Sequence, residues 1–226
     1  VVSDKMDKTV VVAIEDRVEK DLPNITQTSV NVTAGMTFAV GLRALLRQDP
    51  DIIMIGETRD AETAEISVRS AITGHLVVST LHTNDAISSI VRLADMGVAP
   101  YLISNSVVGI VAQRLVRKVC QFCKYEEPAT ADDIAIVGDG IPMITRGKGC
   151  KVCNNTGYKG RISIHEMVYI DKTLKRMIAK SADSQEMLEY AKKTQGMRSL
   201  LDSAIDLVKE GVTTPEEVMK IAYYSD

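Results

Sequence analysis

The sequence predicts an α/β fold with a mostly parallel sheet, an inserted four-cysteine zinc subdomain and a helical C-terminal region. Short apolar strands alternate with helical segments of ten or more residues, a pattern typical of strands joined by crossover helices. All four cysteines fall in two Cys-x-x-Cys pairs, and the pattern turns helical beyond a strand near Arg161. We therefore expect an α/β core over residues 1–118, a zinc subdomain over 119–160, and a strand followed by helices over 161–226.

Size and composition exclude several classes of protein. With 226 residues and 45% apolar content, the chain can bury a substantial core. A net charge of −3, no Trp and only two Phe give no overall reason to bind nucleic acid. The longest apolar runs, such as residues 107–112, are far below the ~18 residues that cross a bilayer. No charged-then-apolar leader opens the chain, so we expect it in the cytoplasm.

Glu57 is the first candidate for a catalytic residue. It follows residues 52–55, an apolar run too short for a helix and suited to a buried parallel strand. Ligands of open α/β sheets bind beyond the carboxyl ends of the strands. A carboxylate there can orient a water for attack on a phosphoryl group or help to hold Mg²⁺. The alternative is that Glu57 only caps the next helix, but Asp60 is the better cap.

The remaining elements follow from apolar spacing, caps and breakers. Two further strands are expected, at residues 9–14 and 76–79, and the first of them ends at Glu15 and Asp16. Thr37 and Asp60 can each cap a helix, and these helices end before Pro50 and Gly74. Further helices are expected over residues 85–96, over residues 100–118, and after a capping box with proline at 214–217.

The cysteine pairs predict a zinc site with the ligands Cys120, Cys123, Cys150 and Cys153. Two Cys-x-x-Cys pairs can supply four thiolates to one tetrahedral Zn²⁺, a closed structural site. A redox pair or two disulfides is the alternative. The 26 residues between the pairs exceed the common zinc-ribbon spacing, so we expect an inserted loop there. Five lysines surround the pairs and would offset the roughly two net negative charges of such a site: Lys118, Lys124, Lys148, Lys151 and Lys159.

Glycines and asparagines next to the second pair suit the tight turns that aim sulfurs at a common metal. They are Gly149 before the pair and the run 154–157 after it. His165 lies in an apolar alternation and is expected on a strand, so it offers no open coordination position. The predicted zinc is therefore structural.

Two segments carry a resemblance to a known family: LRALLRQDPDIIMIGETRD at residues 42–60 and TGHLVVSTLHTNDA at residues 73–86. They resemble the Walker B and His boxes of the secretion ATPases that power type II secretion and type IV pilus assembly. The resemblance extends upstream to residues 13–16 and downstream through 91–97 and 113–118 to the cysteines. It implies a RecA-like P-loop NTPase core, with a tetracysteine zinc subdomain as some members carry at this place.

The resemblance also implies roles for individual acids. Glu15 and Asp16 match the Asp box and Glu57 the Walker B acid. One departure from the family pattern is visible, at Arg17, and one from P-loop enzymes in general, at Gly56. Arg17 follows where the family usually has proline, and Gly56 stands where many P-loop enzymes have a Mg²⁺-binding Asp. Glycine is usual there in this family, so the Asp-box acids would share that task.

The histidines and arginines are weaker candidates. His75 and His82 flank one strand seven positions apart, on opposite faces or ends, so they are not expected to share a metal. Each could be a core or capping histidine. The resemblance assigns both to a nucleotide-sensing His box, with His82 facing the γ-phosphate. Four arginines match family motifs and are candidates to bind nucleotide phosphates, with surface ion pairs as the alternative and Arg59 as first choice: Arg43, Arg47, Arg59 and Arg92.

The phosphate-binding half of the expected site is missing from the sequence. No G-x-x-x-x-G-K-[ST] run is present, and Gly147-Lys148 is the only Gly-Lys pair. In the family the P-loop lies some tens of residues before the Asp box, so Val1 is expected near the end of the helix that follows it. The chain is thus expected to be the C-terminal part of a longer ATPase and inactive alone.

For the intact protein, the resemblance implies a homo-hexamer at the cytoplasmic face of the inner membrane that uses ATP, Mg²⁺ and Zn²⁺. Expected partners are an inner-membrane platform protein and other secretion or pilus machinery, with membrane contact only through partners and no nucleic acid. One alternative is a zinc-ribbon interaction or nucleic-acid-binding module with an inert ATPase-like half. A second is a pilus retraction ATPase, although such motors generally lack the tetracysteine element.

Overall fold

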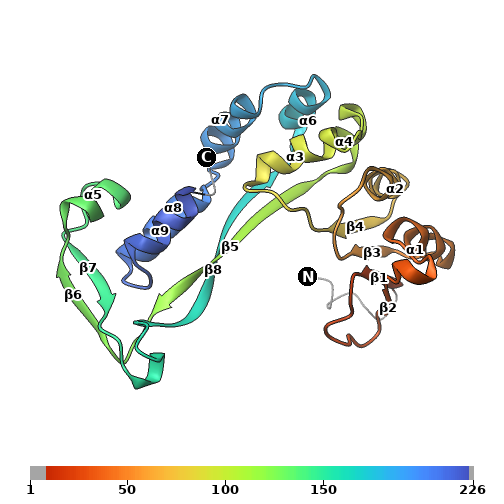
Figure 1. The fold of residues 1–226 in the computed structure, drawn as a ribbon. Helices are drawn as coiled ribbons and strands as arrows, with labels where there is room; N and C mark the ends of the chain where they lie inside the picture. Colours follow the sequence, from red (N-terminus) through yellow and green to blue (C-terminus); the bar gives the residue numbers. More distant parts are fainter. Residues whose placement is uncertain (1–8, 224–226) are drawn as a thin grey trace. The chain divides into compact units, whose positions relative to one another are not determined.

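The computed structural model describes residues 9–223 (Figure 1). The segment around Val1, expected to end a P-loop helix, lies outside the described residues. The described chain forms two compact units. One comprises residues 9–83, Ile87–Gly109 and Tyr169–Met187, and the other comprises Asn84–Ala86, Ile110–Val168 and residues 188–223. The division of the sequence at residues 118 and 160 stays a prediction.

A four-stranded parallel sheet organises the first unit, in the order β2-β1-β3-β4 (Figure 1). Its strands are β1 (Val11–Glu15), β2 (Thr26–Ser29), β3 (Ile52–Ile55) and β4 (Leu76–Ser79). β1 pairs in parallel with both β2 and β3, and β3 with β4. β1 and β3 are almost wholly buried, as expected of apolar strands covered on both faces. The predicted α/β class with a parallel sheet is confirmed.

The helices α1 (Phe38–Leu45) and α2 (Ala61–Ile72) lie beside this sheet (Figure 1). Each begins at its predicted cap, because the Thr37 side chain accepts the Val40 N–H and the Asp60 side chain accepts the Thr63 N–H. Side chains of β1, β3 and α1 form one apolar core, against which residues of α2 and β4 pack. Its fully buried members are Val12, Ile14, Leu42, Leu45, Ile53 and Ile55.

The predicted helix over residues 100–118 is wrong. α3 (Ala86–Asp95) agrees with expectation, but α4 (Pro100–Ser106) is short and the chain then forms β5 (Gly109–Val119). β5 pairs with β8 (Tyr158–Tyr169) in a two-stranded sheet. Its residues include four β-branched side chains, which favour an extended backbone, and long-range pairing with β8 overrides the helical spacing.

The segment between the two cysteine pairs, where an inserted loop was expected, contains two strands and a helix. β6 (Lys124–Pro128) and β7 (Met143–Gly147) pair antiparallel, and α5 (Ala131–Val137) connects them. Within residues 9–223 there are also three short 3-10 turns: Val32–Ala34, Leu46–Gln48 and Lys151–Cys153. The C-terminal region is helical as predicted, with α6 (Lys172–Ala179), α7 (Ser184–Gln195), α8 (Leu200–Lys209) and α9 (Pro215–Tyr223). None of the helices described within residues 9–223 has the length and apolar character that a bilayer crossing requires.

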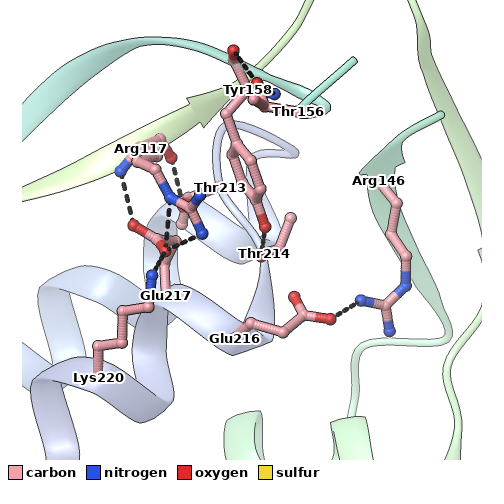
Figure 2. Close-up of polar contacts among 9 residues, drawn as sticks. All are labelled: Arg117, Arg146, Thr156, Tyr158, Thr213, Thr214, Glu216, Glu217 and Lys220. Atoms are coloured by element: carbon pink, nitrogen blue, oxygen red, sulfur yellow. Dashed lines mark hydrogen bonds and ion pairs between the residues drawn. The ribbon is translucent and has the colours of Figure 1, made fainter. Parts of the chain in front are cut away.

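A buried carboxylate attaches α9 to the end of β5 (Figure 2). Glu217 is 4% exposed, and its two oxygens accept hydrogen bonds from the Arg117 N–H and Nε, each at 2.9 Å. The Arg117 guanidinium also lies 3.9 Å above the Tyr158 ring, and the Tyr158 hydroxyl is 2.8 Å from Thr214 Oγ1. Glu217, predicted to take part in a capping box at 214–217, accepts two hydrogen bonds from Arg117 on β5. The capping box itself stays a prediction.

We expect the substitution Glu217→Gln to lower the free energy of unfolding by ~1–3 kcal/mol at neutral pH, since it leaves the Arg117 charge without its anion. Burial raises the pKa of the Glu217 carboxyl, but hydrogen bonds from Arg117 and Lys220 outweigh burial and hold it below its ordinary value of 4.5. This contribution to stability is present above pH 4.5 and is lost as the pH falls through the lower folded-state value.

Urea unfolding of both proteins as a function of pH measures the difference, which should shrink in acid. The exposed Glu210, which has no ion-pair partner among the described residues, provides the control variant Glu210→Gln. An equal loss of stability in both variants would contradict the assigned role of Glu217.

Candidate functional site

Glu57 lies two residues beyond β3 and is 7% exposed. Its Oε2 is 3.1 Å from His82 Nε2 and forms an ion pair with Arg59 Nε. Partial burial raises the pKa of the Glu57 carboxyl, but the hydrogen bonds and positive charge of Arg59 and His82 outweigh burial and hold the pKa below its ordinary value. The carboxyl is therefore ionised at neutral pH.

Polar contacts beyond the strands bring His82 to Glu57. The Thr58 N–H donates to the Thr80 carbonyl at 2.9 Å, and Thr80 Oγ1 donates to the Gly56 carbonyl at 2.6 Å. Thr58 Oγ1 lies 2.8 Å from Ser79 Oγ. The segments that follow β3 and β4 thus stay paired after the regular strands end. Sequence reasoning missed these threonines, since hydroxyl residues after a strand carry no signal of their own.

Gly56 allows the ends of β1 and β3 to approach closely. Its N–H donates to the Ile14 carbonyl at 2.7 Å, and a Cβ added at Gly56 would lie 3.1 Å from Glu15 Cα. Any larger residue would push the two strand ends apart. The predicted carboxylates of both boxes therefore leave adjacent strands at the same edge of the sheet.

The Glu15 carboxylate is oriented by a residue that the sequence did not single out. Gln27 Nε2, on β2, donates to Glu15 Oε1 at 2.7 Å, and the Gln27 side-chain oxygen Oε1 accepts the Leu22 N–H. Asp16, the next residue, is exposed. A polar edge strand such as β2 lacks the apolar alternation by which strands are recognised, so neither β2 nor Gln27 was predicted.

His75 is not brought together with Glu57. It precedes β4 and therefore lies at the amino end of the strand, the opposite edge of the sheet from Glu57. Its Nδ1 is 2.9 Å from the Ser70 carbonyl, where it ties the end of α2 to the start of β4. This geometry agrees with the expectation that His75 and His82 share no metal. A nucleotide-sensing role for His75 stays a prediction.

Of the four predicted arginines, only Arg59 joins the Glu57 cluster. Arg43 forms a 2.6 Å ion pair with Glu62 between α1 and α2, with both side chains more than half exposed. Arg47 and Arg92 are exposed and have no ion-pair partner within residues 9–223. Two arginines thus remain open to another molecule, while two are bound within the chain.

The four cysteines meet in one cluster in the second unit. Their Sγ atoms all lie within 4.8 Å of one another. Three separations are shorter: Cys120 to Cys150 and Cys123 to Cys153 at 3.9 Å, and Cys150 to Cys153 at 3.8 Å. Four sulfurs ~2.3 Å from a tetrahedral Zn²⁺ would be ~3.8 Å apart. All four are free thiols in this structure. The zinc site and its alternatives, a redox pair or two disulfides, stay predictions.

Glycines allow the two cysteine turns to come together. A Cβ at Gly147 would lie 2.1 Å from the Gly157 carbonyl oxygen, and Gly149 has a φ of 90°. Asn154 and Asn155 also have positive φ, which short polar side chains tolerate. The predicted turn residues therefore have the backbone conformations that the cluster requires.

Backbone donors favour the thiolate form at one sulfur. Burial raises the pKa of the Cys153 thiol, but N–H groups of Cys150 and Gly157 lower it to about 6. The Cys150 N–H lies 3.2 Å from Cys153 Sγ. Soft thiolates in a tetrahedral array suit Zn²⁺ and leave no open position, so the donor set fits a structural metal.

Comparison with known proteins identifies the family. The sequence model of the family described as "Type II/IV secretion system protein" matches residues 2–220. The chain belongs to this family. "Type II secretion system protein HxcR" of Pseudomonas aeruginosa is 48% identical over 211 residues, which cover 93% of this chain and 42% of HxcR. "Type IV pilus assembly ATPase PilB" of Thermus thermophilus is 47% identical over 211 residues, or 91% of this chain and 24% of PilB.

The fold of this secretion-system chain has a solved counterpart. The crystal structure of the pilus retraction motor PilT with bound ADP has a TM-score of 0.67 and 26% sequence identity, and covers 94% of this chain and 52% of PilT. The resemblance read from the Walker B and His boxes is thereby confirmed at the level of family and fold. The chain spans only about two fifths of HxcR and a quarter of PilB.

The substitution Arg59→Ala should raise the pKa of Glu57, because it removes the strongest of the contacts that lower this pKa and leaves burial in place. Carbon-detected NMR titration of the Glu57 carboxyl measures the effect on this chain directly. Arg43→Ala is the matched control, since Arg43 pairs with Glu62 and should leave Glu57 unchanged. An unchanged Glu57 pKa in Arg59→Ala would refute the ion pair.

Proposed function

We propose that this chain is the hydrolytic part of a longer motor ATPase that couples ATP hydrolysis to type II protein secretion or type IV pilus assembly. The observation that carries the proposal is the ionised Glu57 carboxylate at the carboxyl edge of the parallel sheet, next to the end of β1. The 47–48% identity to HxcR and PilB supports it.

In this proposal Glu57 orients the attacking water. Phosphoryl transfer to water needs a nucleophile held in line with the terminal phosphate, and a deprotonated carboxylate can both accept the water's hydrogen bond and take up its proton. Arg59 and His82 keep Glu57 deprotonated and fix its direction. His82 is 80% exposed in its side chain, and in the imidazolium form, in which both ring nitrogens are donors, its Nδ1 can donate to a phosphate oxygen.

The Asp-box acids are the proposed Mg²⁺ ligands. Mg²⁺ prefers carboxylate oxygens and water, and Glu15 and Asp16 offer oxygens at the end of β1. Gln27 binds one oxygen of Glu15 and leaves the other for a ligand. Bound Mg²⁺ would neutralise charge on the phosphates, while Glu57 would accept a hydrogen bond from the attacking water.

We propose that the part of the intact protein that carries the phosphate-binding P-loop pairs with β4. β4 is the outer strand in the order β2-β1-β3-β4, and its Leu76 and Val78 are 49% and 44% exposed. A parallel strand added there would deliver a P-loop to the same edge as Glu57. Because the 226-residue sequence contains no P-loop, the chain alone is not expected to hydrolyse ATP.

The assembly and its location are part of the same proposal. We infer a homo-hexamer at the cytoplasmic face of the inner membrane, docked on a platform protein with other secretion or pilus proteins. In such rings an arginine can reach a neighbour's phosphates. Arg47 and Arg92, exposed and without ion pairs in the described chain, are the candidates for that contact.

Two alternatives are less well supported. A pilus retraction motor is favoured by the likeness to PilT, but the identity of 26% is far below that to HxcR and PilB. A zinc-ribbon or nucleic-acid module with an inert ATPase-like half would not need Glu57, Arg59 and His82 in contact. Salt-dependent binding of DNA or RNA to this chain would revive that alternative.

In the full-length protein, Glu57→Gln should slow ATP turnover by ~10²-fold or more while nucleotide binding is retained. The neutral amide cannot take up the water's proton as a carboxylate can. Steady-state hydrolysis and equilibrium nucleotide binding measure the two effects. Glu62→Gln, at an exposed acid paired with Arg43, is the control and should keep near-normal turnover. Near-normal turnover of Glu57→Gln would overturn the proposed role.

We also propose that the cysteine cluster binds one structural Zn²⁺. Cys150→Ser should lose the metal and destabilise the module, because metal binding and local folding are coupled. Metal analysis of reduced, freshly purified protein and thermal unfolding measure this. Ser203→Ala, on α8, is the control and should keep one zinc per chain, since Ser203 Oγ donates to the Ser199 carbonyl and is no cluster residue. Wild-type protein without zinc would refute the site.

A further inference from the structure

Gln27 lies on β2, the outer strand of the parallel sheet in the first unit, and both polar atoms of its amide are bound within that unit. Its Nε2 donates to Glu15 Oε1 at 2.7 Å and to the Lys20 carbonyl at 3.1 Å. Its Oε1 accepts the Leu22 N–H at 2.7 Å. One side chain therefore binds the carboxylate at the end of β1 and two backbone groups of residues 16–25, the segment that joins β1 to β2.

The parallel register of β1 and β2 places these groups together. Glu15 lies opposite Ser29, and Gln27 precedes Ser29 by two positions on the same strand. Side chains two positions apart on a strand point to the same face, so all three share one face of the sheet. Ser29 Oγ accepts the Val18 N–H at 3.3 Å. The segment after β1 thus folds back onto β2, where two side chains hold its backbone.

The partners of Gln27 fix the orientation of its amide. If the oxygen and nitrogen exchanged places, the oxygen would face the Glu15 carboxylate and the Lys20 carbonyl, which are both acceptors. The NH2 group would then face the Leu22 N–H, which is a donor. All three contacts would become unfavourable, so the amide presents its donors to Glu15 in one orientation only. The contact takes one oxygen of Glu15 and thereby fixes the direction of the other.

We propose that Gln27 is a positioning residue for the Mg²⁺ site of the ATPase. It does not bind the ion. It holds Oε2 of Glu15 in one direction and orders the segment that begins at Asp16, the second proposed ligand. The inference rests on the proposed function, in which both acids bind Mg²⁺, and adds the residue that prepares them. Mg²⁺ requires near-ideal octahedral geometry, so ligands that are already oriented bind it at a lower cost.

Two substitutions separate the hydrogen bonds of Gln27 from its volume. Gln27→Met keeps an unbranched side chain of similar size and removes all three bonds. Gln27→Glu keeps the acceptor for the Leu22 N–H, but it sets a second carboxylate against Glu15 and against the Lys20 carbonyl. This variant therefore repels the carboxylate that glutamine attracts.

The first experiment measures ATP hydrolysis by the full-length protein as a function of free Mg²⁺ concentration. In Gln27→Met the concentration for half-maximal activity should rise roughly tenfold, as is typical when a residue that orients a metal ligand is lost. The kcat at saturating Mg²⁺ should change less than about twofold, since the group that orients the water is untouched. Gln27→Glu should raise the Mg²⁺ requirement at least as much. An unchanged Mg²⁺ dependence in both variants would overturn the proposal.

Ser29→Ala is the matched control. Ser29 lies on the same face as Gln27 and holds the same segment, but its bond goes to the Val18 N–H and leaves the Glu15 carboxylate to Gln27. We expect a Mg²⁺ dependence near that of the wild type. An equal rise in Ser29→Ala and Gln27→Met would assign the effect to the order of the segment and overturn the role of the contact with Glu15.

NMR on this chain tests the positioning without ATP or metal. Gln27→Met should lower the side-chain order of Glu15 and accelerate amide exchange at Leu22, whereas Ser29→Ala should accelerate exchange at Val18 and leave Glu15 ordered. A Glu15 side chain equally mobile in wild type and Gln27→Met would refute the positioning role and leave the proposed function standing. Full-length wild type that hydrolyses no ATP would overturn the proposed function and this inference together.

Discussion

The parallel pairing of β1 with β3 is the constraint on which the candidate site depends. Parallel strands end at the same edge of a sheet, so this pairing brings the chain after Ile14 beside the chain after Ile55. Gly56 makes the approach close, since its missing Cβ would otherwise press on Glu15 Cα at 3.1 Å. Two carboxylates from segments some forty residues apart thereby share one edge. The buried apolar strands serve this placement, and the chemistry comes from the residues that follow them.

What turns that edge into a candidate catalytic site is a balance of burial against charge. Burial alone would favour a neutral Glu57, which could not accept a hydrogen bond from water as a base does. Arg59 and His82 reverse the preference, and both lie on segments that are held by hydroxyl and backbone contacts rather than by strands. The protonation state of Glu57 therefore depends on how the loop after β4 is held at Thr80.

Sequence reasoning succeeded where a local signal decides the structure. Apolar runs predicted β1, β3 and β4, the side chains of Thr37 and Asp60 capped their helices, and the spacing of the cysteines anticipated their cluster. It failed where distant pairing decides. β5 was predicted as a helix because its apolar spacing fits both periods until β8 pairs with it. β2 and Gln27 gave no apolar signal, and Glu166 lies in a strand pattern that says nothing of α8, whose Leu200 N–H its side chain accepts.

The arrangement of helices and strands in the second unit depends on a few buried hydrogen bonds and ion pairs. Its strands form only two-stranded pairs, which are marginal by themselves in water. Helices must be held against them, and two buried carboxylates contribute: Glu217 binds Arg117 at the end of β5, and Glu166 binds Leu200 from β8. Replacing a buried ionic contact with apolar groups is often neutral for stability, so such groups are better explained by the arrangement they specify. Glu217 specifies where α9 begins relative to β5. Glu166 specifies where α8 begins relative to β8.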